Sequence, residues 1–345
     1  MFGFERIIDV SENGKSIGLA LIGAGHWGKN LARNFHQLGV LRQLCDADTE
    51  VLARFSAQYD GLETCLEPEQ VFDNESISRV AIAAPAEMHY RLAKRALEAG
   101  KDVFVEKPLC LDVAEAEELI RIADDFERIL MVGHLLQYHP CVYKIHDLIS
   151  SGVLGQLQYI TSNRLNLGKI RREENALWSF APHDLSVILS FAGDRMPRRV
   201  TCSGGSYLTG DVADTTLMAM RFVNGLRAHV YVSWLNPFKE QKLTVIGSKG
   251  MVVFDDTLQW EQKLLLYRDY LNWGEDGIPE PNKMPGEPVE VPKDEPLTCE
   301  CAHFLEASSN RMIPRTDGRE GLRVLRVLHA AQASLDHDSK PVDID

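Results

Sequence analysis

The sequence has little positive charge for its length, and it contains no long apolar run. Its 345 residues include 37 Lys and Arg against 50 Asp and Glu, which gives a formal net charge of −13. A nucleic-acid-binding protein needs basic patches to neutralise phosphates, and the densest basic stretch, IRREEN, is balanced at once by acids. No apolar stretch approaches the roughly 20 residues of a membrane span. We therefore expect no nucleic-acid partner and no membrane partner.

The cysteines form no recognisable metal or disulfide pattern. There are seven of them; Cys299 and Cys301 form a CxC, but no second Cys or His pair follows at zinc-site spacing, so we expect no metal. Free thiols are typical of a reducing compartment. The N-terminal stretch MFGFERIIDVSENGKS carries acids and no long apolar run, which does not fit a signal peptide. We expect a cytoplasmic protein.

Strand-like and helix-like segments alternate through the first 139 residues. Short apolar runs read as strands, and amphipathic segments of 10–15 residues follow them, as in a parallel sheet covered on both faces. We therefore expect an α/β fold in which residues 1–139 form a Rossmann dinucleotide-binding domain. The expected strands are 17–23, VLRQLCDAD (40–48), the start of ISRVAIAAPAEMHY (77–90), KDVFVEKP (101–108) and RILMVGHLLQ (128–137).

The pattern changes near Pro140, where the apolar period moves toward two. RFVNGLRAHV (221–230) has the Asn-Gly turn of a β-hairpin, and other strand-like stretches lie on both sides of it. Residues 140–345 are thus expected to form an α+β substrate-binding and oligomerisation domain with a large, mainly antiparallel open sheet. Two helices close the chain, and the last can pack back on the first domain. Residues 274–296, rich in Pro, Gly and acids, are expected to be a surface loop.

The stretch GAGHWG (23–28) follows the first expected strand and opens a helix. In that context GxGxxG indicates a dinucleotide-binding turn: Gly23 permits the tight turn, Gly25 lets the backbone approach a pyrophosphate, and Gly28 allows close helix–strand packing. The helix N-terminus then faces the anion. His26 and Trp27 lie in the same turn and are expected to border the cofactor, although ordinary helix packing is an equal alternative for Trp27. A plain strand–helix corner is the alternative for the whole turn.

Asp46 ends the second expected strand, near the position where a carboxylate holds the adenosine ribose hydroxyls. Asp48 adds a second acid, which would repel a 2′-phosphate, so NAD is favoured over NADP. Capping of the next helix is the alternative role for Asp46, and it is compatible with the first.

Glu106-Lys107-Pro108 ends the fourth expected strand, at the sheet edge where ligands of open parallel sheets bind. Pro108 keeps Lys107 out of helical geometry. A Lys at this edge could hydrogen-bond a substrate hydroxyl and help remove its proton; a solvated surface Lys is the alternative.

These motifs, with AAPAEMHY, EKPL, LISSGVLGQL, SWLNP, VIGSKGMVVFDD and RTDGREGLRVLRVLHAAQASL, resemble the Gfo/Idh/MocA oxidoreductase family in order and spacing over nearly the whole chain. The resemblance implies a Rossmann domain, a second domain with a large open sheet, pyranose or cyclitol substrates, and a catalytic role for Lys107. The family usually carries an Asp four residues before a His at the start of a helix of the second domain. Here His183 matches the His, Ser179 stands at the Asp position, and Asp184 follows as a local substitute.

The run RREEN…LWSFAPHD resembles the branch of the family that acts on nucleotide-activated amino sugars. The resemblance implies NAD-dependent oxidation at C3 of a UDP-N-acetylhexosamine-type sugar to a 3-keto sugar. A histidine has the intrinsic pKa for taking the hydroxyl proton, so we expect His183 to be the base and Lys107 to bind the same oxygen, with the two roles interchangeable. A helix-entry histidine satisfied by Asp184 is the alternative.

Further residues are expected around the ligands. Arg164 and Arg171 could clamp a diphosphate, although a solvated charge run is equally compatible. The remaining candidates are Pro85 and His89 near the cofactor, and Tyr138 and Asn163 near the sugar.

Several other functions are compatible with these residues: oxidation of a free sugar or inositol, an NAD-dependent glycosidase, and a dinucleotide-binding sensor without turnover. The apolar sheet of the second domain suits a homodimer or homotetramer. The sequence leaves open which sugar and nucleotide are bound, and in which direction the reaction runs.

Overall fold

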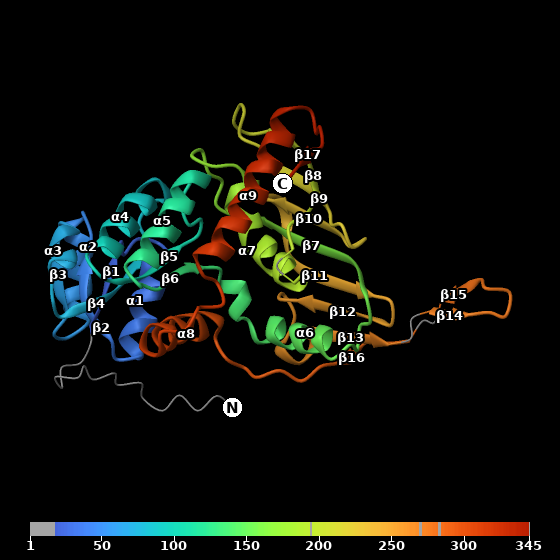
Figure 1. Cartoon of the computed structure of the whole chain (residues 1–345), viewed down its shortest axis with the longest axis horizontal. Coiled ribbons are helices and arrows are strands. Elements are labelled where there is room, and N and C mark those ends of the chain that lie inside the picture. Colours follow the sequence, from blue (N-terminus) through green and yellow to red (C-terminus); the bar gives the residue numbers. More distant parts are fainter. Residues whose placement is uncertain (1–17, 194, 269–270, 282–283, 345) are drawn as a thin grey trace. The chain divides into compact units, whose positions relative to one another are not determined.

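The computed structural model describes residues 18–344 except 194, 269–270 and 282–283 (Figure 1). The chain forms two compact units. The first contains the residues up to Tyr138 together with Asp294–Leu325, and the second contains His139–Lys293 and Arg326–Asp345. The expectation that the N-terminal stretch is no signal peptide concerns residues 1–17, which lie outside the described residues. Within the described part of the chain, no helix is long and apolar enough to cross a membrane.

The first unit is built on a six-stranded sheet of order β3-β2-β1-β4-β5-β6 in which every pair is parallel. Central β1 is buried along its whole length, as expected for a strand covered on both faces. The strand order reverses between β1 and β4, where open α/β sheets bind ligands. The predicted Rossmann fold is confirmed. The strands are β1 (Gly18–Ile22), β2 (Leu41–Cys45), β3 (Glu63–Cys65), β4 (Ile77–Ile82), β5 (Asp102–Glu106) and β6 (Leu130–Gly133).

Helices connect these strands and begin at recognisable caps. Asp48 and Asp112 precede two of the helices, and each side chain accepts hydrogen bonds from backbone N–H groups of the first turn. The helices are α1 (Gly28–Gln37), α2 (Thr49–Gln58), α3 (Glu69–Phe72), α4 (Ala86–Glu98) and α5 (Val113–Asp125), followed by the short 3₁₀ helix η1 (Leu135–Tyr138).

A distant segment completes the Rossmann unit. Helix α8 (Pro296–Asn310) lies beside α1, although the two come from opposite ends of the chain (Figure 1). The ring of Phe304 on α8 packs edge-on against Phe35 of α1 and Phe104 of β5, with centroid distances of 6.5 and 5.8 Å. The hydroxyl of Thr298 also donates to the Asn34 side chain at 2.6 Å. These contacts close the core on that side of the sheet.

The second unit is built on a nine-stranded sheet of order β16-β13-β12-β11-β7-β10-β9-β8-β17. Strands β7 and β10 are parallel, and the other pairs are antiparallel. This confirms the predicted large, mainly antiparallel sheet. Its strands are β7 (Leu157–Leu167), β8 (Arg199–Gly205), β9 (Thr215–Arg221), β10 (Arg227–Ser233), β11 (Leu235–Gly247), β12 (Gly250–Asp255), β13 (Leu264–Arg268), β16 (Glu287–Pro288) and β17 (Val342–Asp343).

Helix α7 (Ala176–Phe191) covers one face of this sheet and contacts β7, β9 and β10. Helix α6 (Pro140–Ser150) opens the unit, and a 3₁₀ helix, η2 (Trp260–Gln262), follows β12. Helix α9 (Gly318–Asp336) crosses the division between the two units.

The structure of the second unit contains the predicted hairpin turn, but a segment that was expected to be a loop contains strands. Gly225, with φ of 92°, closes the predicted hairpin between β9 and β10. Residues 274–296, expected as a loop, contain two short strands. One of them, β15 (Pro279–Pro281), pairs with β14 (Leu271–Trp273), because Gly277 at φ 74° lets the chain reverse.

Candidate active site

In the glycine-rich turn between β1 and α1, only one of the three glycines has room for a Cβ atom. Gly23 has φ of 89°, and a Cβ built on it would lie 2.8 Å from the Ala83 backbone. A Cβ on Gly28 would lie 2.1 Å from the Gly23 carbonyl oxygen. At Gly25 no atom lies within 4 Å of the Cβ position. The protein's own packing therefore requires Gly23 and Gly28, whereas Gly25 borders open space of the kind a pyrophosphate needs.

Asp46 lies against this turn. Its Oδ2 accepts a hydrogen bond from the Ala24 backbone N–H at 2.7 Å, and its Oδ1 accepts one from the Asp48 N–H at 3.0 Å. Asp48 is the residue that caps α2, with the Glu50 N–H donating to its Oδ1 at 2.8 Å. The alternative role of Asp46 as the helix cap is therefore wrong, and its carboxylate stands next to the turn that would hold the dinucleotide.

His89 joins two loops at the carboxyl edge of the sheet. It is 1% exposed; its Nδ1 lies 2.7 Å from the carbonyl oxygen of Pro108, and its Nε2 lies 2.9 Å from that of Ala84. Burial lowers the pKa of this imidazole. His89 thus holds the loop after β4 to the loop after β5 from inside. Pro85 stands at the N-cap of α4, and His26 is exposed in the glycine turn.

Glu106 ends β5 and is buried, and the half-buried Lys107 follows it. The Trp27 indole N–H donates to Glu106 Oε1 at 2.5 Å, and the Lys107 N–H donates to Oε2 at 3.3 Å. Burial raises the pKa of Glu106 to about 7, although the Trp27 hydrogen bond and the charge of Lys107 oppose that rise. The peptide between Lys107 and Pro108 is cis. Trp27 therefore connects the dinucleotide turn to the strand end that carries Lys107.

His183 lies on α7 in the second unit and is half-buried. The next residue, Asp184, is 2% exposed and faces β7. Its Oδ1 accepts hydrogen bonds from Ser162 Oγ at 2.7 Å and from Arg164 Nη2 at 3.0 Å, and its Oδ2 accepts one from Arg164 Nε at 2.7 Å. Asp184 thus anchors α7 to β7. Its role as the acid partner of His183, and that of Arg164 as a diphosphate ligand, stay predictions.

The other substrate residues fall in different environments. Tyr138 is fully buried in the Rossmann unit, where its hydroxyl lies 2.9 Å from Thr316 Oγ1, so the expected sugar contact is corrected to a core position. Asn163 Nδ2 donates to Glu240 Oε1 at 2.7 Å. Arg171 pairs with Glu174 in the loop that precedes α7, with 3.1 Å between Nε and Oε1.

Sequence reasoning missed several buried groups around β5 and β6. Glu300 on α8 is fully buried, and His134 Nδ1 lies 2.6 Å from Glu320 Oε2. A Cβ on Gly133 would lie 2.9 Å from Glu106 Oε2, so this glycine makes room for the carboxyl. Gly133 and His134, at the end of an expected strand, were the sequence signal that could have pointed to these groups. Glu300 had no such signal, since it stands in an ordinary helical pattern.

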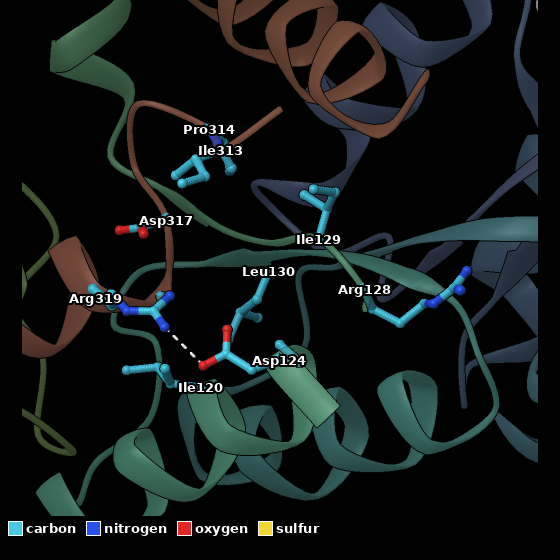
Figure 2. Close-up of a pocket in the computed structure, with 11 residues that line it drawn as sticks. Ile120, Asp124, Arg128, Ile129, Leu130, Ile313, Pro314, Asp317 and Arg319 are labelled. Carbon is cyan, nitrogen blue, oxygen red and sulfur yellow. Dashed lines mark hydrogen bonds and ion pairs between the residues drawn. The ribbon is translucent and has the colours of Figure 1, made fainter. Parts of the chain in front are cut away.

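A separate pocket lies on the Rossmann unit (Figure 2). Figure 2 shows Arg319 pointing to Asp124, and their Nη2 and Oδ2 atoms are 2.7 Å apart. No residue of the predicted site lines this pocket, so we assign it no part in the chemistry. Its lining residues are Ile120, Ala123, Asp124, Arg128, Ile129, Leu130, Ile313, Pro314, Asp317, Gly318 and Arg319.

The chain matches two family descriptions. Residues 17–134 match the Gfo/Idh/MocA description "Oxidoreductase family, NAD-binding Rossmann fold", and residues 142–253 match "GFO/IDH/MocA C-terminal domain". The open space at Gly25 and the position of Asp46 fit such a cofactor. Among the described residues, no group of three or more His, Cys, Asp or Glu side chains could hold a metal ion.

Curated relatives have different activities. The chain is 26% identical over 313 residues to UDP-N-acetylglucosamine 3-dehydrogenase of Acidithiobacillus ferrooxidans, covering 88% of this chain and 93% of the relative. It is also 26% identical over 258 residues to 2,7-anhydro-N-acetylneuraminate hydratase of Mediterraneibacter gnavus, covering 70% and 68% of the two chains.

Solved structures share the fold. The A. ferrooxidans dehydrogenase GnnA superposes with a TM-score of 0.82 at 23% identity, covering 94% of this chain and 99% of that one. GenD2 from gentamicin A biosynthesis, solved in complex with NAD, superposes with a TM-score of 0.80 at 21% identity, covering 96% and 97%. The two family matches, together with the glycine turn and the strand order, show that this chain belongs to the Gfo/Idh/MocA oxidoreductases and is an NAD-dependent dehydrogenase of that family.

Proposed function

We propose that this protein oxidises a secondary alcohol, at C3, of a nucleotide-activated sugar such as a UDP-N-acetylhexosamine. The observation that carries the proposal is the similarity to a UDP-N-acetylglucosamine 3-dehydrogenase over 88% of this chain. The sequence also contains Lys107 at the carboxyl end of β5 and His183 on α7, two groups suited to handling the hydroxyl proton.

The residues around the glycine turn would hold the cofactor. Backbone N–H groups at the start of α1 would bind the pyrophosphate over Gly25, and Asp46 would accept hydrogen bonds from the adenosine ribose. When bound, NAD supplies the hydride acceptor for the carbon–hydrogen bond of the alcohol. His89 keeps the Pro108 loop in place from below.

Side chains of the protein must accept the proton of the substrate hydroxyl. In this proposal His183 accepts the proton, and Lys107 binds the same oxygen and orients it; the two roles are interchangeable. Lys107 follows a carboxyl whose own protonation changes near neutrality, so the charge next to the ammonium group varies with pH. The Ser162–Asp184–Arg164 contacts support the helix turn that carries His183.

The direct test is NADH absorbance with a panel of UDP-hexosamines, UDP-uronates, free hexoses and inositol. We expect reduction of NAD with a UDP-N-acetylhexosamine, and a 3-keto product identified by borodeuteride reduction and mass spectrometry. His183→Asn and Lys107→Met should each lower kcat by about 100-fold or more, in the range of a lost acid–base group, with NAD affinity retained. His337→Asn, at an exposed residue that directly follows α9, is the matched control. Equal turnover of His183→Asn and the control would remove His183 from the mechanism.

A second function is favoured by the hydratase relative. A sugar oxidised transiently at the same site, with the hydride returned in the same turnover, would give a product without net NADH. Sugar conversion with bound NAD and no absorbance change would support this function, as it would for the glycosidase alternative.

We also propose a cytoplasmic homodimer or homotetramer. All seven cysteines are thiols, which suits a reducing compartment. Large apolar side chains are exposed on three strands of one sheet: Leu167 on β7, Leu217 on β9 and Phe238 on β11, at 67%, 48% and 60%. Such a surface fits a second copy of the chain, and light scattering after gel filtration would measure the assembly.

A further inference from the structure

Two cysteines are paired on neighbouring strands at one edge of the Rossmann sheet. Cys45 ends β2 and Cys65 ends the edge strand β3, and the two residues are partners in the parallel ladder. Neighbouring strands lie about 4.8 Å apart, and a disulfide needs roughly 4.4–6.8 Å between its Cα atoms. The backbone therefore holds the two cysteines at a separation that a disulfide can span.

Both cysteine side chains lie on the same face of the sheet. Gln43 and Cys45 are two residues apart on β2, so their side chains point to one face. The Gln43 Nε2 atom donates a hydrogen bond to Cys65 Sγ at 3.5 Å, which places the Cys65 side chain on that face as well. The Cys45 thiol also donates a hydrogen bond to the Cys65 sulfur. The two sulfur atoms are thus direct neighbours.

Cys65 is the more reactive thiol of the pair. The hydrogen bond from Cys45 lowers the pKa of Cys65, and the hydrogen bond from Gln43 adds to this effect, although burial opposes it. Asn74 Nδ2 holds the Gln43 amide in place by donating to its Oε1 at 3.1 Å. The contact with Cys65 raises the pKa of Cys45, which keeps its proton. Because the thiolate is the nucleophile, Cys65 reacts first with an oxidant, and Cys45 is placed to react second.

The burial of the pair limits which oxidant can react with it. Cys65 is 8% exposed and Cys45 is 1% exposed. Hydrogen peroxide is small and uncharged, so it can approach Cys65 past the edge of the sheet. Glutathione disulfide carries charged peptide arms that need a wider approach. The exposure therefore favours a peroxide over a bulky disulfide as the oxidant.

We propose that Cys45 and Cys65 are a redox modification site, where hydrogen peroxide forms a reversible disulfide that weakens NAD binding. The Cys65 thiolate attacks one peroxide oxygen; an S–O bond forms, the O–O bond breaks, and the leaving hydroxide takes the proton of Cys45 to become water. The Cys45 thiolate then attacks the Cys65 sulfenic acid; the S–S bond forms, the S–O bond breaks, and the second hydroxide takes a proton from solvent. Two electrons pass from the sulfurs to the peroxide, and a dithiol reductant returns them by exchange.

The disulfide would act on the cofactor turn through the backbone of β2. The Cys45 carbonyl oxygen accepts a hydrogen bond from the Gly23 N–H at 2.8 Å, and the Asp46 N–H donates to the Cys65 carbonyl oxygen at 3.2 Å. A disulfide brings its Cβ atoms to about 3.8 Å, which is closer than the spacing of the strands. The backbone that positions Gly23 and Asp46 therefore shifts when the bond forms. This step rests on the proposed role of Asp46 in holding the ribose of NAD.

Peptide mapping of the full-length protein detects the bond directly. The protein is treated with a small molar excess of hydrogen peroxide, the remaining thiols are alkylated, and trypsin cleaves the chain. Cleavage after Arg54 separates the two cysteines, with Cys45 in peptide 43–54 and Cys65 in peptide 55–79. We expect these two peptides to be linked, and dithiothreitol to separate them.

The variants test whether the link is specific. Cys45→Ser and Cys65→Ser should give no linked peptides. Cys299→Ser, at a half-buried cysteine on α8, keeps the pair and is the matched control. Glutathione disulfide at the same concentration should give little of the linked product in the same time.

Calorimetry with NAD and no sugar measures the consequence. We expect peroxide to weaken NAD binding about tenfold in the unsubstituted protein and in Cys299→Ser, within the usual range of coupling between two sites, and dithiothreitol to restore it. In Cys45→Ser and Cys65→Ser, peroxide should leave the NAD affinity of each variant unchanged. Because such coupling is reciprocal, saturating NAD should shift the disulfide toward the thiols by the same factor in dithiothreitol redox buffers.

The decisive measurements use the unsubstituted protein, so they do not depend on how well a variant folds. Peroxide treatment that leaves peptides 43–54 and 55–79 unlinked would overturn the proposal, and equally fast linkage by glutathione disulfide would contradict the choice of oxidant. Linked peptides with an unchanged NAD affinity would contradict the effect on the cofactor turn. Neither measurement involves sugar turnover, so failure of the proposed dehydrogenase activity is a separate result.

Discussion

Replacing Asp184 by Asn tests whether this residue is structural or catalytic. The carboxylate is 2% exposed and receives two hydrogen bonds from Arg164 and one from Ser162. Asn has one oxygen and no charge, so it leaves the Arg164 guanidinium largely buried without its counter-ion. Removing one partner of a buried ion pair costs about 3–5 kcal/mol. We expect Asp184→Asn to lower the free energy of unfolding of the second unit by that amount.

The measurement is thermal and urea unfolding followed by circular dichroism. For a unit of this size, each kcal/mol shifts Tm by roughly 2–4 °C, so the loss corresponds to a decrease of roughly 6–20 °C. The double variant Arg164→Met with Asp184→Leu removes both charges and should recover most of the stability, because a buried pair replaced by apolar residues is often neutral or stabilising.

The opposite result would refute this reasoning. If Asp184→Asn unfolds at the unsubstituted Tm but loses turnover, the carboxylate acts on His183 and not on the α7–β7 contact. A double variant that is less stable than either single one would also contradict the ion-pair account.

Three further predictions concern the Rossmann unit. Gly25→Ala should keep the unsubstituted Tm, because its Cβ enters open space, and should weaken NAD binding in calorimetry by about 100-fold, since the methyl group then occupies the place of the pyrophosphate; unchanged affinity would place the cofactor elsewhere. Asp46→Ser should weaken NAD binding about tenfold or more through lost charge-assisted hydrogen bonds, and a variant still discriminating against NADP would assign that selectivity to Asp48. Burial raises the pKa of Glu106 from an ordinary 4.5 to about 7 in the folded protein. Protonated Glu106 therefore contributes about 3 kcal/mol to the free energy of unfolding below pH 4.5, and this contribution is lost as the pH rises to 7. Glu106→Gln should therefore gain stability relative to the unsubstituted protein across that window in urea titrations, and a constant difference would contradict the pKa.

The fold could be predicted because its signals are local. Buried β1 is an unbroken apolar run, and the residues after it contain the GxGxxG spacing, so strand, turn and helix can be assigned from a short window. The hairpin at Asn224-Gly225 can also be predicted from a short window, because a two-residue turn specifies its flanking strands. The short strands within 274–296 escaped prediction because that segment is polar and proline-rich, and pairing between backbones carries little sequence signal.

The site could be predicted only in part. Gly23, Asp46 and Lys107 stand at strand ends, and strand ends of a parallel sheet meet at one edge. The Arg164–Asp184 pair joins a strand to a helix, and nothing in the spacing of the two residues favours that contact over a free guanidinium. Glu300 was missed because its burial depends on the packing of α8 against elements that are distant from it in the sequence. Tyr138 was misplaced because an aromatic residue at a strand-to-helix connection fits a core as well as a cleft.

Because the Rossmann unit includes residues 294–325, it cannot complete its folding on the ribosome until most of the second unit has been synthesised. When residue 293 has been synthesised, all six strands of the first sheet exist, but Phe304, which covers Phe35 and Phe104, has not been made. The nascent first sheet therefore keeps an uncovered aromatic surface while residues 139–293, which contain all strands of the second sheet except β17, are translated, and chains in such a state are prone to aggregate. A fragment ending at residue 138 would have the same exposed surface permanently, and expression of the dinucleotide-binding part requires residues 294–325 to be supplied with it.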